Sequence, residues 1–130
     1  MSQNNVDKLR RGYEAFNRGE YDAALAFCHP EIEFFPPGDQ PPYRGAERFR
    51  AWMEPDAFET QVVEPREYTV AGNKVLVEQD IKVRGAGSGI ELEIHSWNVW
   101  SFDEEGLATR VQTFLEHEGT EAREAAGLSE

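Results

Sequence analysis

The sequence has a single cysteine, Cys28, and no apolar run near the roughly 20 residues that a membrane-spanning helix needs. One cysteine cannot form a disulfide within the chain, which is typical of proteins from the reducing cytoplasm. Basic residues are also scarce: 13 Lys and Arg stand against 25 Asp and Glu and give a net charge of -12. A chain this acidic repels nucleic-acid phosphates and anionic membrane surfaces. We therefore expect a cytoplasmic protein that binds neither nucleic acid nor membrane.

Known metal and cofactor motifs are missing as well. The three histidines (His29, His95 and His117) fall on separate predicted elements without a short ligand spacing, and there is one cysteine. No HExxH, P-loop or GxSxG motif is present. We therefore expect no metal site and no cofactor.

The composition is that of one folded domain. The 130 residues are 39% hydrophobic and 12% aromatic, enough for a core. We expect a single domain over residues 1–130, with flexible ends at 1–4 and 127–130.

The first part of the chain predicts three helices. A helical spacing of 3, 4 and 3 residues defines one apolar face, made of Val6, Leu9, Tyr13 and Phe16. Asn4 or Asn5 would cap this helix, and Gly19 would end it. A second helix, capped by Asp22, would carry Cys28 and stop at Pro30. A third is predicted over 45–54.

The remainder predicts a run of strands. They are expected at 31–35, 60–70, 74–84, 90–102 and 107–115, before a last helical turn at 120–126. Pro65, inside the second of these strands, indicates a sheet edge or a bulge. Helices followed by antiparallel strands predict an α+β fold, with helices packed on one face of a curved sheet.

Several segments together resemble a known family. They are 9–27 (LRRGYEAFNRGEYDAALAF), Tyr43-Arg44-Gly45, the strand ending in Trp100, and 121–128 (EAREAAGL). Their order resembles the SnoaL-like proteins of the nuclear-transport-factor-2-like superfamily, which also contains ketosteroid isomerase. The resemblance implies a cone-shaped, cystatin-like α+β barrel, in which a curved antiparallel sheet wraps three helices around a deep apolar pocket. It also implies a homodimer through the convex sheet face.

The family has no single activity. Its members include polyketide cyclases, isomerases, epoxide hydrolases, dehydratases and non-catalytic binding domains, so the fold does not decide the function. By resemblance to the isomerases, Tyr13 occupies the position of the oxyanion donor. Phe35 and Trp97 stand where those enzymes have their two carboxylic acids, which makes isomerase chemistry at these positions doubtful.

Two carboxylates on the strand at 74–84 are candidates for acid–base work. By resemblance, the face that holds Glu78 and Asp80 looks into the cone, where two carboxylates about 7 Å apart raise each other's pKa. Periodicity alone favours the opposite arrangement. The alternate face, with Val75 and Val77, is apolar and would pack inward, leaving the carboxylates in solvent.

The strand at 90–102 adds a histidine. His95 shares a face with Trp97, so by resemblance it would face the pocket, and its pKa near neutrality suits a general base. The alternative is a histidine at the rim or the dimer interface without a chemical role. Asn98 faces away from Trp97 and is assigned to the interface.

These residues lead to two hypotheses. In the first, a pocket lined by Phe16, Phe35, Trp52 and Trp97 binds a small apolar or polycyclic molecule. Catalysis would be cofactor-free isomerisation, cyclisation or hydration, with His95 and Glu78 or Asp80 moving the proton and Tyr13 stabilising an oxyanion. In the second, the protein is a non-catalytic binding or dimeric interaction domain.

Overall fold

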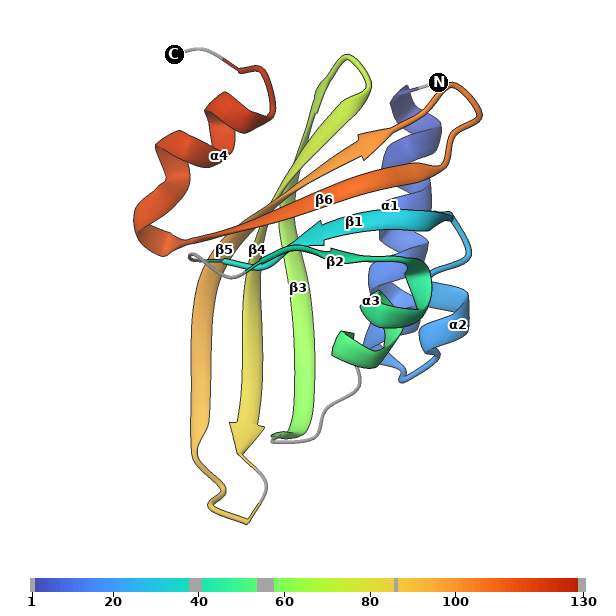
Figure 1. The fold of residues 1–130 in the computed structure, drawn as a ribbon. Coiled ribbons are helices and arrows are strands. Elements are labelled where there is room, and N and C mark those ends of the chain that lie inside the picture. Colours follow the sequence, from blue (N-terminus) through green and yellow to red (C-terminus); the bar gives the residue numbers. More distant parts are fainter. Residues whose placement is uncertain (1, 38–40, 54–57, 86, 129–130) are drawn as a thin grey trace.

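A curved sheet of six strands organises the chain, and helices lie on both of its faces (Figure 1). The computed structural model describes residues 2–37, 41–53, 58–85 and 87–128. In chain order the elements are α1 (Ser2–Asn17), α2 (Tyr21–Ala24), β1 (Cys28–Phe35), β2 (Tyr43–Arg44), α3 (Ala46–Met53), β3 (Phe58–Ala71), β4 (Lys74–Gly85), β5 (Glu91–Phe102), β6 (Ala108–Leu115), the 3-10 helix η1 (Glu116–Glu118) and α4 (Gly119–Ala125). The predicted α+β class is confirmed. No helix among the described residues is long and apolar enough to cross a membrane.

The sheet has the strand order β2-β1-β6-β5-β4-β3. Strands β3 to β6 follow one another as antiparallel neighbours. The first strand departs from the all-antiparallel expectation, because β1 pairs with β6 in parallel. These two strands are far apart in the sequence, so no hairpin forces them to run in opposite directions.

The first helix follows its predicted apolar face. Val6, Leu9 and Tyr13 are buried against the sheet. The helix begins at Ser2, ahead of the predicted cap at Asn4 or Asn5, and the chain turns at Gly19 with a φ of 79°. Gly12 lets Phe27 approach closely, since a Cβ atom on Gly12 would lie 2.6 Å from the Phe27 ring.

The predicted second helix is too long. α2 ends at Ala24, Asp22 lies in its first turn instead of capping it, and Cys28 begins β1. Pro30 belongs to this strand and does not end a helix. The strand tolerates it because the pairing of β1 with β6 is irregular between Cys28 and Glu33, where a missing N–H breaks no regular ladder.

Pro65 lies at both a sheet edge and a bulge, as its sequence position predicts. β3 is the edge strand, and its register with β4 shifts between Pro65 and Glu67. The bulge leaves Arg66 as an extra residue and re-aims its side chain. Nearby, the Asn17 amide of α1 pairs with both backbone groups of Val63, donating at 2.8 Å and accepting at 2.9 Å. This contact covers part of the exposed edge.

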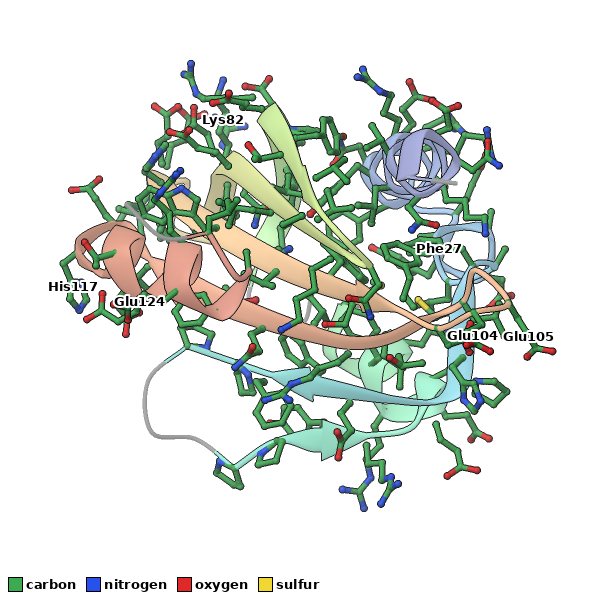
Figure 2. The ribbon with its side chains drawn as sticks, turned by 90° about the horizontal axis from the view of Figure 1, so that it is seen from above. Phe27, Lys82, Glu104, Glu105, His117 and Glu124 are labelled. Atoms are coloured by element: carbon green, nitrogen blue, oxygen red, sulfur yellow. The ribbon has the colours of Figure 1, made fainter. Side chains whose placement is uncertain are left out.

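The two sheet faces have separate apolar clusters. On the concave face, Val75, Val77 and Trp100 pack with α1, α2 and α3. On the outer face, Leu76 and Val99 pack with α4. Phe27 lies on the side of α1, and Lys82 lies on the other side of the sheet (Figure 2). Because side chains alternate along a strand, neighbouring residues of β4 and β5 serve different clusters.

Candidate functional site

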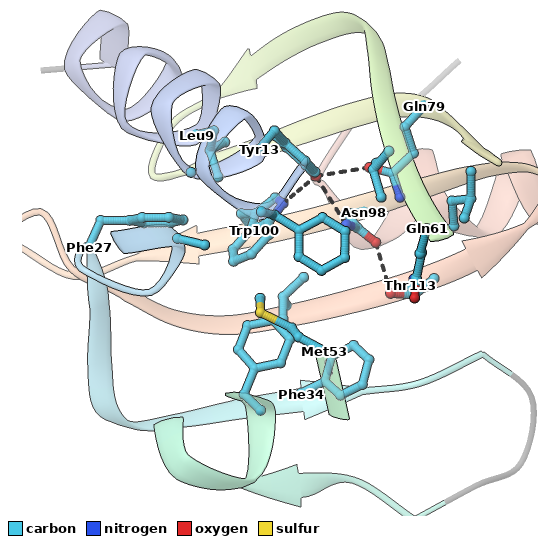
Figure 3. A pocket seen from close by; sticks show the side chains of 17 residues that line it. Leu9, Tyr13, Phe27, Phe34, Met53, Gln61, Gln79, Asn98, Trp100 and Thr113 are labelled. Carbon is cyan, nitrogen blue, oxygen red and sulfur yellow. Dashed lines mark hydrogen bonds between the residues drawn. The ribbon is translucent and has the colours of Figure 1, made fainter. Parts of the chain in front are cut away.

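A pocket of about 90 Å³ lies between the concave face of the sheet and the three N-terminal helices (Figure 3). Its aromatic wall consists of Tyr13, Phe16, Phe27, Phe34, Phe49 and Trp100. Polar atoms come from Gln61, Gln79, Asn98 and Thr113 on four different strands. The pocket is therefore a mainly apolar site with a few polar groups, the usual character of a small-molecule site.

The Tyr13 hydroxyl is the centre of the polar network. It donates a hydrogen bond to Oε1 of Gln79 at 2.9 Å and accepts from Nδ2 of Asn98 at 3.0 Å and Nε1 of Trp100 at 3.1 Å. A phenol has one donor and two acceptor positions, so all of its capacity is used. The helix α1 is thereby tied to both β4 and β5.

Further hydrogen bonds hold the two amides in place. Thr113 donates to Oδ1 of Asn98 at 2.8 Å, and Nε2 of Gln79 donates to the Ser96 hydroxyl at 3.1 Å. Each amide nitrogen carries two hydrogens, and this network uses one of them. Among the described residues, Asn98 and Gln79 thus each keep one N–H with which to meet an oxygen of a ligand.

The described lining of the pocket includes no group that exchanges protons near neutral pH. Of the described residues that line it, none is a carboxylate, histidine, lysine, arginine or cysteine. The remaining titratable group is Tyr13, and burial raises the pKa of its hydroxyl, although the hydrogen bonds from Trp100 and Asn98 oppose this. Tyr13 therefore stays neutral, as a hydrogen-bonding group and not as a base.

Glu78, Asp80 and His95 come together on the opposite, outer face of the sheet. The two ring nitrogens of His95 both face carboxylates: Nδ1 lies 2.9 Å from Oδ1 of Asp80, and Nε2 lies 2.9 Å from Oε2 of Glu78. Arg66, re-aimed by the bulge in β3, donates to the other oxygen of Asp80. An imidazole donates from both nitrogens only when it is protonated, so this geometry favours the cation.

The charges in this cluster shift one another's pKa. Hydrogen bonding to Asp80 raises the pKa of His95, Glu78 adds to the effect, and partial burial opposes it. Hydrogen bonds from His95 and Arg66 lower the pKa of Asp80, whose side chain is only 7% exposed.

The described residues include no group of three or more His, Cys, Asp or Glu side chains that is arranged to hold a metal ion.

The family model for the SnoaL-like domain matches residues 9–111. This chain belongs to the SnoaL-like family. Solved structures share its fold at low identity. TerC, crystallised with polyporic acid, is 20% identical with a TM-score of 0.75, covering 87% of this chain and 92% of its own. SalBIII is an epoxide hydrolase/cyclase-like enzyme with a role in pyran ring formation in the polyether salinomycin. It is 15% identical with a TM-score of 0.79, and the match covers 88% of this chain and 92% of SalBIII.

A third similar structure has no known function. It is a nuclear-transport-factor-2-like protein from Burkholderia pseudomallei K96243, 22% identical with a TM-score of 0.77, covering 96% of each chain. Curated proteins give no match. Family membership and fold are therefore clear, while the activity of this SnoaL-like protein has to be argued from its own pocket.

The expectation that Glu78 and Asp80 look into the cone is wrong. The residues of β4 that line the pocket are Gln79 and Ile81, on the alternate face. Periodicity alone favours this face, because it continues the apolar pattern of Val75 and Val77. The expected pocket position of His95 is wrong for the same reason, since Asn98 and Trp100, not His95, contribute from β5.

The expected aromatic lining is partly corrected. Tyr13 and Phe16 line the pocket, whereas Phe34 takes the place expected for Phe35. The ring of Phe35 lies under the Arg110 guanidinium, 4.4 Å from its centroid. Trp97 is on the outer face, where it contacts His95 with ring centroids 4.8 Å apart. The side chain of Trp52 lies outside the described residues.

Apart from Tyr13, the polar residues of the pocket are not predicted from the sequence. Gln79 carries a usable signal, because it is the one polar residue on the otherwise apolar face of β4. A lone amide on an apolar face needs a buried partner, and Tyr13 supplies it. Asn98, assigned to the interface, lines the pocket, since its even position on β5 faces the helices.

Removing the Tyr13 hydroxyl should destabilise the protein. Tyr13→Phe leaves the partner atoms on Gln79, Asn98 and Trp100 buried without this bond, so we expect the free energy of unfolding to fall by about 2–3 kcal/mol. Urea denaturation measures this. Tyr68→Phe is the matched control, because the buried Tyr68 hydroxyl has no hydrogen-bond partner among the described residues. Its removal should be neutral or stabilising, and equal losses in both variants would contradict the network.

The outer cluster links stability to pH. Since the folded pKa of His95 is raised, its contribution is complete below the unfolded value of about 6.5 and is lost as pH rises through the folded pKa. The contribution of Asp80, whose folded pKa is lowered, is present above about 3.9 and is lost as pH falls through its folded pKa. We therefore expect the difference in unfolding free energy between wild type and His95→Gln to be largest between about pH 3.9 and about pH 6.5.

Denaturation over a pH series, with NMR titration of the His95 ring, checks this dependence. Asp80→Asn should return the pKa of His95 toward 6.5. A stability difference that persists unchanged at high pH, or a His95 pKa unaffected by Asp80→Asn, would show that the cluster does not hold the protonated ring.

Proposed function

We propose that this protein binds a small, neutral, largely apolar molecule and holds one of its oxygens through the amides around Tyr13. The observation that carries this proposal is the chemistry of the pocket. Its described wall is apolar, and its polar groups are a phenol, an indole, amides and a hydroxyl. Among these described lining residues a charged ligand would find no counter-charge, and burying a charge unpaired is costly. The net charge of -12 further disfavours anions.

The comparisons support a small organic ligand. TerC was crystallised with polyporic acid, and SalBIII acts in forming a pyran ring. The pocket here is about 90 Å³, against roughly 300 Å³ or more for sites that enclose a drug-sized molecule. We therefore infer that a single ring or a short carbonyl-bearing segment enters it, in preference to a complete polycyclic system.

We favour binding over acid–base catalysis. His95, Glu78 and Asp80 would have to move the proton, but their side chains lie across the sheet from Tyr13. Cyclase or isomerase chemistry is the second candidate, because the family includes such enzymes. In this pocket it would rest on hydrogen bonds to an oxyanion, donated by the free amide hydrogens of Asn98 and Gln79.

Calorimetric titration with 2-pentanone, a neutral ketone, tests the proposed function. Asn98→Leu removes the amide that faces the ligand and should weaken binding by about tenfold, the value of one hydrogen bond. Gln112→Leu is the matched control, because it makes a similar change on the outer face of β6 and should leave the affinity unaltered. Binding that is absent in wild type, or equally weak in both variants, would contradict the proposal.

The same ketone separates binding from catalysis. A protein that enolises carbonyl compounds accelerates exchange of the hydrogens beside the carbonyl in heavy water. We expect no acceleration, which NMR can measure. Acceleration that Tyr13→Phe abolishes would favour the second candidate.

We also propose that the protein is a homodimer through the outer face of β3, β4 and β5. The part of this face away from α4 carries opposite charges in pairs, including Lys82 with Glu64 at 3.0 Å and Arg66 with Asp80. Such pairing partly neutralises this surface on a strongly acidic chain, which reduces repulsion between two copies.

Light scattering tests the dimer directly. We expect wild type at twice the monomer mass and Lys82→Glu, which sets two acidic side chains side by side, at the monomer mass. Arg48→Glu, an exposed charge reversal on α3, is the control and should remain dimeric. A monomeric wild type would refute this arrangement.

We infer that the protein acts in the cytoplasm. The support is its sole cysteine, Cys28, which is a buried free thiol. Burial raises the pKa of this thiol to about 12, so it stays protonated and unreactive. Such cysteine usage is typical of a reducing compartment.

A further inference from the structure

An exposed apolar strip lies beside the pocket. Among the described residues, the large hydrophobic side chains that are most exposed include Ile90 at 62%, Leu92 at 56% and Ile94 at 37%. Ile90 directly precedes β5. Leu92 and Ile94 occupy alternate positions at its start, so these two share one face of the sheet. This is the concave face, the one that also carries Asn98 and Trp100 into the pocket.

The strip adjoins the pocket wall at Ile81. Ile94 pairs in register with Ile81, which lines the pocket, and Leu92 pairs with Val83. Residues directly opposite on antiparallel strands place their side chains next to each other. In Figure 1 the hairpin of β4 and β5 extends beyond α1, α2 and α3, so helices do not cover this end of the sheet.

The reverse side of the same hairpin is charged. Glu91 forms an ion pair with Arg84 at 3.5 Å, and Lys82 pairs with Glu64. Exposed apolar side chains that lie together on one face cost solubility and are typical of a binding surface, so we interpret the strip as one.

We propose that the exposed apolar strip binds the hydrocarbon tail of the ligand whose oxygen-bearing head enters the Tyr13 pocket. This inference rests on the proposed function, because it extends the same site. A cavity of about 90 Å³ holds only the head of such a molecule. From Asn98 to Leu92 the strand covers about 20 Å, at about 3.4 Å per residue. The ligand class is therefore an elongated, uncharged molecule with a carbonyl or hydroxyl at or near one end.

A series of methyl ketones from 2-pentanone to 2-heptadecanone, whose extended chain is long enough to reach Leu92, tests the strip by calorimetry. Wild type should gain about fourfold in affinity for each methylene that reaches the strip, the value of one buried CH₂. In the double variant Leu92→Ser with Ile94→Ser, the affinity for 2-heptadecanone should fall at least tenfold, while that for 2-pentanone stays within twofold. Val70→Ser is the matched control, because Val70 is 39% exposed on β3 and is outside the pocket lining.

The outcomes separate the two proposals. If 2-pentanone binds and longer ketones bind no better, the strip does not bind the hydrocarbon tail. The same conclusion follows if the double variant still gains affinity as the ketone becomes longer. If the double variant changes the oligomeric state seen by light scattering, a second copy covers the strip and the inference is overturned. If no ketone binds at all, the binding function fails together with the strip.

Discussion

The Tyr13 hydroxyl is the interaction on which the rest of the site depends. It joins α1 to Gln79 of β4 and to Asn98 and Trp100 of β5, and it uses every hydrogen-bonding position that a phenol has. Because this hydroxyl is buried and all of its hydrogen-bonding positions are used, it holds the side-chain amides of Gln79 and Asn98 in place. Both amides line the pocket, and among the described residues each keeps one N–H beyond this network, so we expect an oxygen of a ligand to bind there.

Because side chains alternate along each strand, the sheet places neutral polar groups on its concave face and charged groups on its outer face. Along β4, Gln79 faces the helices, while Glu78 and Asp80 face the other way and meet His95 and Arg66. The charged groups on the outer face pair with one another. Each ring nitrogen of His95 lies next to a carboxylate, and Asp80 accepts hydrogen bonds from two donors. Ionisable groups thus gather where they can pair near solvent, and the pocket keeps neutral groups, which are cheaper to bury.

Much of the fold, including the inward face of β4, follows from local patterns, but the partners of the charged residues do not. The helical face of Leu9 and Tyr13, and the edge and bulge at Pro65, are predictable from spacing and from the chemistry of proline. The apolar pattern of Val75 and Val77 indicates that this face of β4 packs inward, and the helices cover it, while α4 covers part of the other face through Leu76. Burial of Asp80 depends on Arg66, which a bulge fourteen residues away re-aims, so no local pattern around Asp80 indicates it.

The most direct test of this account is the NMR response of the indole N–H groups to 2-pentanone. Trp100 donates to Tyr13 inside the pocket, and Trp97 lies on the outer face of the same strand beside His95. With saturating ketone, the Trp100 indole signal should shift and the Trp97 signal should stay in place. A shift of Trp97 alone, or of neither signal, would contradict a binding site built around Tyr13.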